Sequence, residues 1–409
     1  MRANLTAALI GMLSVAGCGG GGSSVGNTTP PPTGSNVQAI TVDSGPTVVA
    51  NSSNPAINTL YTTVKICVPG TSTCQDIDHI QIDTGSSGLR IISTVLTLSL
   101  PLQKDTNGNT VAECVHFVDG SSWGPLRLAD IKIADEVASN QQVQIIGDSA
   151  YQTIPNDCIG TATAENTVTA FGANGILGVG PFLQDCGSSC VTAGGAVYYT
   201  CTSSTACTDS GMPLTRQLTN PVTAFATDNN GVIIQLPTVN GTTSSVSGSL
   251  IFGIGTQGNN GLGNAKVFTV DDSGSLSTTY NNTSLSHSFI DSGSNAYFFP
   301  DSTIKQCGSK AKGFFCPSAT LNLSATIVGR SGTSAAVSFS VTSAESLLGT
   351  GTVVAAASNL AGSSADINTS NGTLSQTFDW GLPFYFGRNV YTAIETKNTS
   401  AGMGPYFAF

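Results

Sequence analysis

Two short stretches of this sequence share one pattern, in which an apolar run stops at an aspartate followed by a glycine turn. The first copy is IQIDTGS, from Ile80 to Ser86, and the second is SFIDSGS, from Ser288 to Ser294. Burying an unpaired charge costs several kcal/mol, so an aspartate directly after a buried strand needs hydrogen bonds or a partner. The repeat therefore predicts that Asp83 and Asp291, 208 residues apart (291 − 83), are brought together.

Paired carboxyls have a defined chemistry. Two carboxylates about 3 Å apart cannot both ionise, so they share a proton, and one acts as base while the other acts as acid. A water between them becomes a nucleophile. The competing interpretation is a pair of strand-end Asx turns, which are common in β proteins.

Both stretches resemble the active-site loops of pepsin-like aspartic peptidases. Three further blocks resemble that family in the same order: Asn174–Gly180 (NGILGVG), Gly248–Gly253 (GSLIFG) and Trp380–Ile394. The segment Cys114–Gly124 is similar to the hairpin flap that closes over the cleft of the family. The resemblance implies an all-β, bilobal, pepsin-like fold, with two pseudo-twofold-related β lobes and a central cleft.

The resemblance also implies roles for individual residues. Asp83 and Asp291 would be catalytic, and the hydroxyls of Thr84 and Ser292 would join the two loops across the pseudo-twofold axis. The hydroxyls of Ser86 and Ser294 would support the outer oxygens of the two carboxyls. The flap and the remaining loop positions would be His116, Phe117, Gly120, Gly85 and Gly293.

Three positions depart from the family pattern. Phe117 stands where the flap carries a tyrosine, so a hydroxyl is missing there. Arg90 replaces the aromatic residue that follows the first loop, and Pro383 aligns with the glycine of the last threading strand. These departures indicate a divergent member of the family.

Length and composition agree with two lobes built from strands. A chain of 409 residues is longer than one typical core, and only 9% of its residues are charged, while Val, Ile, Thr and Phe are frequent. The boundaries we expect are 1–17 for a signal peptide, 18–37 for a tether, 38–215 for the N-terminal lobe and 216–409 for the C-terminal lobe. A net charge of −10 argues against nucleic acid as a partner.

The N-terminus is typical of a targeting segment. One arginine precedes a short apolar run, Leu5–Val15, which is too short to span a bilayer as a helix. The ending Val15–Cys18 resembles the lipobox of bacterial lipoproteins, whose cysteine is acylated; an ordinary secretory signal with a stray cysteine is the alternative. We therefore expect a protein anchored in the bacterial cell envelope by a lipid on Cys18. The expected membrane is the outer membrane, with the protein on its periplasmic or surface face. The Gly/Pro-rich segment from Cys18 to residue 37 would then act as a flexible tether.

The cysteines fit an oxidising compartment. Of the 11 cysteines, ten remain when Cys18 is set aside, and this even number predicts disulfides. Zinc is the competing interpretation, but paired Cys-x-x-Cys spacings are missing. Short-range pairing and elimination suggest Cys67 with Cys74, Cys186 with Cys190, Cys201 with Cys207, Cys307 with Cys316, and Cys114 with Cys158.

Other patterns receive ordinary interpretations. Gly120–Gly124 (GSSWG) has the form of a serine-hydrolase elbow around Ser122, but Pro125 and an alternating strand follow, so a hairpin turn is favoured. Gly253–Gly258 spells a dinucleotide fingerprint without a following helix, so no cofactor is expected. His116 and His287 are expected near the cleft, with His287 in a structural role.

The sequence thus predicts an aspartic endopeptidase that acts on peptide or protein substrates as a monomer, with no cofactor or metal. The alternative is a pepsin-like surface lipoprotein that binds peptide or glycan in its cleft without catalysis.

Overall fold

The computed structural model describes residues 33–118, 120–159, 163–309, 311–349, 353–365, 368–369 and 372–409, with the backbone alone for Ile159 and for 368–369 and 372–373. The predicted signal peptide, the predicted acylation site Cys18 and most of the predicted tether lie outside the described residues. No helix in the described part of the chain has the length and apolar character needed to cross a membrane.

Strands dominate the fold, as the scarcity of charged helix formers predicts. The first half of the chain contributes β1 (Val37–Val42), β2 (Leu60–Cys67), β3 (Cys74–Asp83), β4 (Ser87–Ile92), β5 (Thr110–His116), β6 (Ser121–Ile133), β7 (Glu136–Ile146), β8 (Gly175–Val179), β9 (Tyr198–Ser203) and β10 (Ala206–Asp209).

The second half contributes β11 (Gly231–Gln235), β12 (Thr242–Thr243), β13 (Val246–Phe252), β14 (Val267–Thr269), β15 (Leu276–Tyr280), β16 (Thr283–Ile290), β17 (Tyr297–Phe299), β18 (Leu321–Val328), β19 (Ser334–Val341), β20 (Ala356–Ala357), β21 (Ala361–Ser363), β22 (Asn368–Thr369), β23 (Gly372–Thr373), β24 (Asp379–Trp380), β25 (Asn389–Ala393), β26 (Asn398–Thr399), β27 (Gly402–Met403) and β28 (Tyr406–Ala408). The helices among the described residues are single turns: α1 (Thr47–Ala50), α2 (Asn156–Ile159), α3 (Val168–Phe171) and α4 (Ala344–Leu348).

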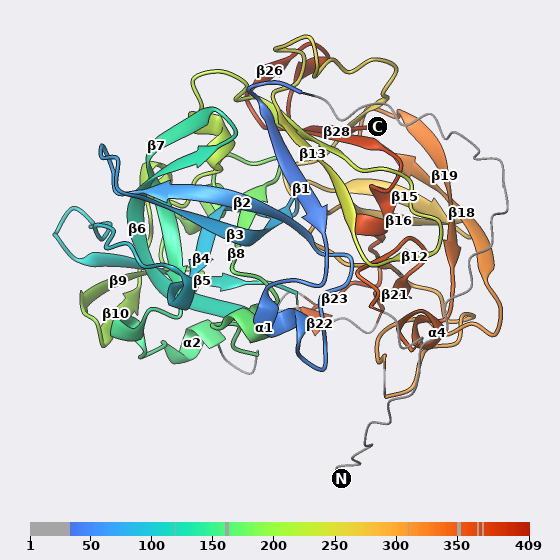
Figure 1. Ribbon diagram of the computed structural model, residues 1–409, viewed down its shortest axis with the longest axis horizontal. Helices are drawn as coiled ribbons and strands as arrows, with labels where there is room; N and C mark the ends of the chain where they lie inside the picture. The colour runs from blue at the N-terminus through green and yellow to red at the C-terminus, as the bar shows by residue number, and fades with distance from the viewer. Residues whose placement is uncertain are drawn as a thin grey trace, which may run out of the picture. The chain divides into compact units, whose positions relative to one another are not determined.

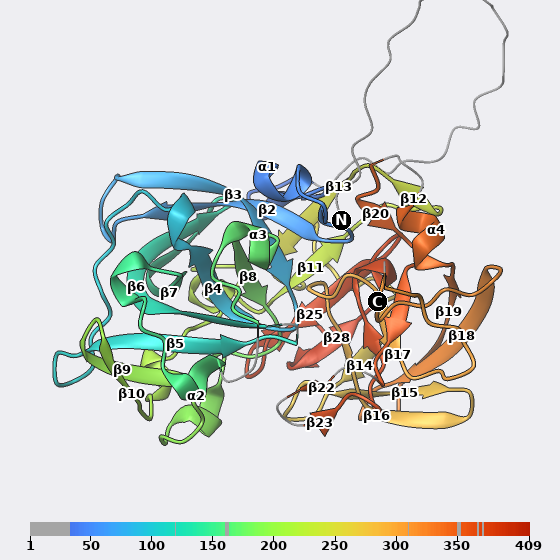
Figure 2. The ribbon, with the colours of Figure 1, turned by 90° about the horizontal axis from the view of Figure 1, so that it is seen from below.

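The strands form two lobes joined by a shared sheet. Strands β2 to β10 lie on one side of the molecule and β15 to β21 on the other, with β1 and β13 between them (Figures 1 and 2). β1 pairs antiparallel with both β2 and β13, and the sheet continues through β11, β25, β28 and β14. A separate seven-stranded sheet in the second lobe has the order β19-β18-β15-β16-β24-β17-β21. The expected all-β, bilobal architecture is confirmed.

The cores of the two lobes differ in kind. Alternating aliphatic side chains such as Ile80, Ile82 and Leu89 fill the first lobe. In the second lobe, Phe378 stacks on Trp380 with ring centroids 4.1 Å apart. The same aromatic cluster includes Tyr280, Tyr297, Phe299, Phe339 and Phe384.

Five disulfides lie within the described residues, and they join the pairs expected from the sequence. They are Cys67–Cys74, Cys114–Cys158, Cys186–Cys190, Cys201–Cys207 and Cys307–Cys316. These cysteines are therefore not free thiolates, and the zinc interpretation is wrong for them.

Candidate active site

The first aspartate loop is held by a strand that runs between its two arms. β3 ends at Asp83 and pairs parallel with β8, while β4 begins at Ser87 and pairs antiparallel with the same strand. Gly178 of β8 lies opposite Asp83 on one side and Gly88 on the other. A Cβ at Gly178 would lie 2.6 Å from the backbone nitrogen of Ser87, so only glycine fits this crossing.

The second loop repeats this construction. β16 ends just before Asp291 and pairs parallel with β24, which pairs antiparallel with β17. The backbone nitrogen of Asp291 donates to the carbonyl of Trp380 at 3.1 Å. A Cβ on Gly381 would lie 2.1 Å from the carbonyl oxygen of Ala296. Gly381 is therefore the counterpart of Gly178.

This arrangement corrects one expectation from the sequence. Pro383 does not replace the threading glycine, because Gly381 occupies that place and Pro383 lies in the following 3-10 turn, Leu382–Phe384. The expectation from the sequence placed the threading glycine two residues too late, in the turn that follows the strand. The second lobe therefore keeps the glycine that its loop crossing requires.

The two loops exchange hydrogen bonds that mirror one another. Thr84 Oγ1 donates to the carbonyl of Ile290 at 3.2 Å, and Ser292 Oγ donates to the carbonyl of Ile82 at 2.9 Å. The backbone nitrogens complete the exchange: that of Ser292 donates to Thr84 Oγ1 at 2.9 Å, and that of Thr84 donates to Ser292 Oγ at 3.1 Å. Each hydroxyl thus fixes the partner loop, as the residue types suggest.

The carboxyl groups receive matching donors from their own loops. The backbone nitrogen of Gly85 donates to Asp83 Oδ1 at 2.7 Å, and that of Gly293 donates to Asp291 Oδ1 at 2.7 Å. Ser86 Oγ donates to Asp83 Oδ2, and Ser294 Oγ donates to Asp291 Oδ2 at 3.1 Å. The eight loop residues singled out from the sequence are therefore brought together.

The pair is close enough to hold a common proton. Removal from bulk water raises the pKa of Asp291 well above its ordinary value, and the negative charge of Asp83, to which its carboxyl is hydrogen-bonded, raises that pKa further. Asp83 itself is only 5% exposed. Because two adjacent carboxylates repel one another, one proton stays on the pair over a wide pH range.

Two side chains that the sequence reasoning missed complete this region. The hydroxyl of Tyr385 lies 2.8 Å from Thr84 Oγ1, and because the Thr84 hydrogen is used on Ile290, Tyr385 is the donor. Asp379 of β24 is 5% exposed, and its charge contributes to the raised pKa of Asp291. A lone acid between Phe378 and Trp380 is the sequence signal that could have revealed it.

A cavity of about 420 Å³ opens above the pair. Its lining combines the two aspartates and their serines with the tip of the hairpin formed by β5 and β6. At the tip, the nitrogen of Phe117 donates to the carbonyl of Gly120 at 2.8 Å, and the Phe117 ring packs edge-on against Phe171. The expected flap is therefore a hairpin over the cavity, with a phenyl ring in place of a hydroxyl.

The two histidines expected near the cleft lie in different places. His116 lines the cavity, and its Nδ1 lies 2.9 Å from Ser121 Oγ, next to the turn of the flap. His287 is exposed on β16 and does not line this cavity, so its expected place near the cleft is wrong. Within the described residues, no cluster of three or more His, Cys, Asp or Glu side chains is arranged to hold a metal ion.

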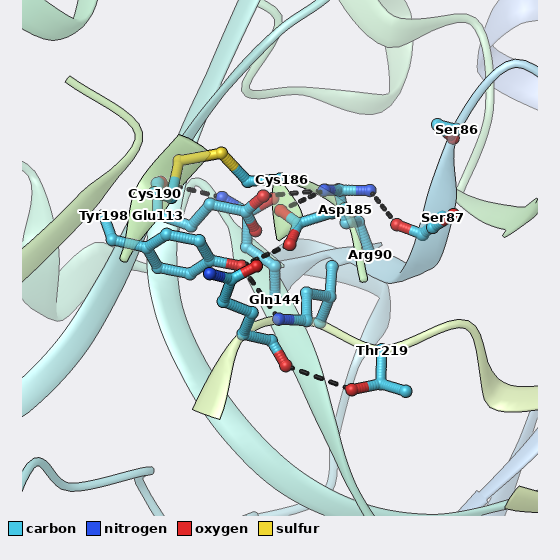
Figure 3. Close-up of polar contacts among 12 residues, drawn as sticks. Ser86, Ser87, Arg90, Glu113, Gln144, Asp185, Cys186, Cys190, Tyr198 and Thr219 are labelled. Carbon is cyan, nitrogen blue, oxygen red and sulfur yellow. Dashed lines mark hydrogen bonds and ion pairs between the residues drawn. A yellow bond between two sulfur atoms is a disulfide. The ribbon is translucent and has the colours of Figure 1, made fainter. Parts of the chain in front are cut away.

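One wall of the cavity carries a buried charge network, drawn in Figure 3. Arg90 Nη2 donates to Glu113 Oε1 at 2.6 Å and lies 3.3 Å from Asp185 Oδ2, while Nη1 donates to the carbonyl of Ser87 at 3.0 Å. Tyr198 donates its hydroxyl hydrogen to Asp185 Oδ1 at 2.5 Å. The network links β4, the flap strand β5 and the segment after β8.

The electrostatics of this network explain how Arg90 can be buried. Burial raises the pKa of Asp185 well above its ordinary value and the charge of Glu113 raises it further, while Arg90 opposes the shift. A hydrogen bond to Glu113 also raises the Asp185 pKa, so the neutral form of Asp185 is favoured beside the single guanidinium. Arg90 therefore forms an ionic link to the flap strand, a pairing that sequence spacing alone did not suggest.

Ser122 is not a hydrolase nucleophile in this fold. It lies within β6, opposite Val115 of β5, and its hydroxyl donates to the carbonyl of Glu165 at 2.9 Å. A nucleophile elbow requires a strand-to-helix turn with an exposed serine, whereas Ser122 is fully buried. The hairpin is as expected, although Ser121–Trp123 belong to its strand and not to its turn.

Comparisons with known proteins give a family and a distant structural neighbour. A crystal structure of an aspartic proteinase from Irpex lacteus matches with a TM-score of 0.48 and 14% sequence identity, over 91% of this chain and 96% of that chain. No curated protein matches this sequence. The family pattern described as "Protein of unknown function (DUF3443)" matches residues 32–409. The chain therefore belongs to the DUF3443 family.

Proposed function

We propose that this protein is a divergent pepsin-like aspartic endopeptidase that hydrolyses peptide bonds with a water activated by Asp83 and Asp291. One observation carries the proposal: two carboxyls hydrogen-bonded to each other meet at the floor of a cavity, each with a glycine nitrogen and a serine hydroxyl as donors. A pair of unrelated Asx turns would not need the reciprocal contacts of Thr84 and Ser292.

The proposed reaction needs one ionised and one protonated carboxyl. Asp291, whose pKa is raised, holds the proton and donates it to the carbonyl oxygen of the peptide, while Asp83 accepts a proton from the attacking water. The new carbon–oxygen bond gives a neutral tetrahedral diol. Its collapse breaks the carbon–nitrogen bond, with Asp83 returning its proton to the leaving amine and Asp291 recovering one from the diol.

The surroundings suit an extended peptide. Phe117, Phe171 and Val197 offer apolar contacts in the cavity, and the flap lies across it. The Phe117 ring cannot donate a hydrogen bond to the substrate or to water. We therefore expect slower turnover than a flap with a hydroxyl would allow, with the chemistry still carried by the two carboxyls.

The proposed setting is the bacterial envelope. Acylation of Cys18 would hold the protein at the membrane as a monomer, with peptides or proteins of that compartment as substrates. Metabolic labelling with an alkyne fatty acid tests the anchor: the wild type should incorporate label and Cys18→Ala should not. Labelling of both proteins would contradict the proposed site.

A second candidate function is binding of peptide or glycan without turnover. The buried Arg90 network and Phe117 favour it, since both place groups beside the cavity that take no part in water activation. This alternative predicts that ligand affinity is nearly unchanged when an active-loop aspartate becomes asparagine.

Cleavage of a diverse peptide library separates the two functions. The full chain in detergent is assayed from pH 3 to pH 8 beside Asp83→Asn, with Asp228→Asn as a control because Asp228 is a buried acid outside the cavity lining. Cleavage by the wild type and the control, but not by Asp83→Asn, supports the proposal. Absence of cleavage by folded wild-type protein would contradict it.

A further inference from the structure

The charged side chains around the cavity are mostly acids. Among the described residues, one arginine and one histidine line it together with five carboxyl side chains, which are Asp83, Glu113, Glu165, Asp185 and Asp291. A concave surface with an excess of one charge attracts ligands of the opposite charge. Two of the five acids form the aspartate pair. The other three have no part in the proposed water activation, so they are candidates for substrate recognition.

The strand register puts Arg90 and its partners on the same wall as the first aspartate loop. Gln81 of β3, Ile176 of β8 and Arg90 of β4 are successive partners across the sheet, so their side chains lie on one face, and all three line the cavity. Gln81 comes two residues before Asp83, and its Nε2 donates to the carbonyl of Gly293 at 3.0 Å. A peptide whose scissile bond lies at the aspartate pair would therefore place a nearby side chain against this wall.

This wall carries one acceptor that the chain itself does not satisfy (Figure 3). Arg90 Nη2 contacts Glu113 Oε1 and Asp185 Oδ2, and Tyr198 donates to Asp185 Oδ1. Glu113 belongs to the cavity lining and is fully buried, yet its Oε2 receives no hydrogen bond from any nitrogen or hydroxyl of the described residues. Leaving a buried carboxylate oxygen without a donor is costly, so this oxygen points to a ligand that supplies one.

The charge balance of the wall favours a cation over an anion. Arg90 Nε also lacks a hydrogen-bond partner among the described residues. The Arg90 charge, however, already has two carboxyls beside it, Glu113 at 2.6 Å and Asp185 at 3.3 Å. An anionic ligand would be a third acid next to a single guanidinium, whereas a cationic ligand would match the second carboxyl.

Asp185 offers the exposed part of this wall and is held in place. Its side chain keeps 6% of its surface exposed, and its backbone nitrogen donates to the carbonyl of Leu218 at 3.1 Å. Tyr198 fixes Oδ1 at 2.5 Å, and the disulfide Cys186–Cys190 begins at the next residue. A carboxyl that is already held in place loses little conformational freedom when a ligand binds.

A bound cation would also favour the ionised form of Asp185. The titratable groups that face Asp185 are Glu113 on β5, Arg90 on β4 and Tyr198 on β9. Burial raises the pKa of Asp185, and the charge of Glu113 raises it further, whereas the charge of Arg90 lowers it. The ammonium or guanidinium of a ligand would act as Arg90 does, so the network can accept a cation while Asp185 releases its proton to solvent.

We propose that this wall is a subsite for a basic side chain, so that the cavity selects peptides with a lysine or arginine close to the scissile bond. The cationic group would lie against Asp185 and the unpartnered Glu113 Oε2. In naming a scissile bond the inference rests on the proposed function, but recognition of the cation would serve a protein that binds peptide without turnover equally well.

Peptide binding tests the subsite without any need for cleavage. An eight-residue host of alanine and phenylalanine carries lysine, its uncharged analogue norleucine, or glutamate at each position in turn. Each peptide is titrated calorimetrically at neutral pH into the full chain in detergent with Asp83→Asn, which blocks turnover under the proposed function. At one position, lysine should bind about tenfold more tightly than norleucine. Equal affinities at every position, or a preference for glutamate, would overturn the proposal.

Two matched substitutions locate the preference, because each removes one acid from the cavity lining. In Glu113→Gln the amide oxygen can still accept from Arg90, but the acceptor for the ligand is lost, so the preference for lysine should fall below about threefold. Glu165 lies at the flap turn, where its carboxyl carbon is 2.5 Å from the place of a Cβ on Gly120. Glu165→Gln should therefore keep the preference. An equal loss in both variants would show attraction by the whole cavity and overturn the subsite.

Cleavage of the same peptides by the wild type separates this inference from the proposed function. If lysine is preferred in binding but no peptide is cleaved, the proposed function fails and the subsite stands. If peptides are cleaved by the wild type and not by Asp83→Asn, while lysine gives no advantage in binding, the subsite is wrong and the proposed function stands.

Discussion

The loop after β3 and the loop after β16 are alike at the aspartates and differ in the residues that pack behind them. Thr84 and Ser292 make the same cross-loop contacts, and Gly178 and Gly381 stand at the same crossing. Behind the first loop, Arg90 of β4 pairs with Ile176 of β8; behind the second, Phe298 of β17 pairs with Asp379 of β24.

This difference separates what the site requires from what can vary. The glycines and hydroxyls recur because the backbone crossing and the mirrored hydrogen bonds need them in both lobes. The residues behind the loops have no such constraint, so one lobe places a cation beside an aliphatic side chain and the other an aromatic ring beside an acid. Asp379 of the second lobe therefore adds to the raised pKa of Asp291, while Arg90 ties the first lobe to the flap.

Removing disulfides should give the largest losses in the free energy of unfolding, and the loss should differ between the two lobes. Cys114–Cys158 spans 44 residues at the flap strand, and Cys307–Cys316 spans 9 residues in the second lobe. Loop-closure entropy predicts losses in the free energy of unfolding of about 4 and about 3 kcal/mol when each pair is changed to alanine. Urea unfolding of the two double variants measures both values, and a larger loss at the second-lobe pair would reverse the expected order.

Gly178 and Gly381, the glycines of the two threading strands, should tolerate substitution by alanine about equally badly. Gly178→Ala and Gly381→Ala place a Cβ within 2.6 Å and 2.1 Å of backbone atoms, so each should lower the free energy of unfolding. We expect about 3 kcal/mol for each.

The matched control for the glycines is Gly258→Ala. A Cβ at Gly258 would meet no atom within 4 Å. This variant should unfold at the urea concentration of the wild type. If Gly381→Ala behaved like this control, Gly381 would not be the counterpart of Gly178.

Removing the two cross-loop hydroxyls should lower the free energy of unfolding by slightly different amounts. Thr84→Val leaves three groups without their partner, namely the Ser292 nitrogen, the Tyr385 hydroxyl and the Ile290 carbonyl. Ser292→Ala leaves two. We expect losses of about 3 and about 2 kcal/mol, because each unsatisfied buried group costs about 1 kcal/mol or more.

Thr84→Ser keeps the hydroxyl and serves as the control for this pair, with unfolding in urea as the measurement. Thr84→Val and Ser292→Ala variants as stable as Thr84→Ser would show that the mirrored contacts do not hold the loops together.

The smallest predicted effect depends on pH. His79 lies 3.5 Å from Asp43 and 2.9 Å from Asp78, and the hydrogen bond to Asp43 raises the His79 pKa above 6.5. Its stabilising contribution is therefore complete below pH 6.5 and is lost as the pH rises through the folded-state pKa. The Asp43 pKa is lowered, because its hydrogen bonds outweigh the opposing effect of burial, so its own contribution is lost only in acid.

In the second lobe, Arg330 forms an ion pair with Asp271 that contains no histidine. The difference in unfolding free energy between the wild type and His79→Gln should fall by less than about 1 kcal/mol from pH 5 to pH 8, because the raised pKa values of Asp185 and Asp291 act on both proteins alike. A difference that does not change with pH would contradict a contribution from His79.

Sequence reasoning reached the features that depend on local pattern. The apolar runs before Asp83 and Asp291 were enough to predict that the two carboxyls meet, and the resemblance to pepsin-like peptidases supplied the roles of the hydroxyls after them. Cysteine spacing was enough for the four short-range disulfides, and elimination gave Cys114–Cys158. These signals are contained within a few residues, and the repeat supplied the long-range pairing.

What the sequence did not reveal depends on contacts between distant segments. Glu113 and Asp185 meet Arg90 across 23 and 95 residues, and Asp379 approaches the second aspartate loop from a strand of two residues, opposite Phe289. Such a short strand carries no periodicity, so Gly381 was misaligned with Pro383. Buried charges of this kind are visible only once the strand order is known.

Binding of a transition-state mimic tests the central claim most directly, namely that Asp83 and Asp291 act together on water. A peptide with a statine hydroxyl and its deoxy twin are titrated calorimetrically into the wild type, Asp83→Asn and Asp291→Asn. We expect the wild type to prefer the hydroxyl form by about 100-fold or more, and both variants to lose that preference. Equal affinity of the wild type for the two peptides would contradict the claim.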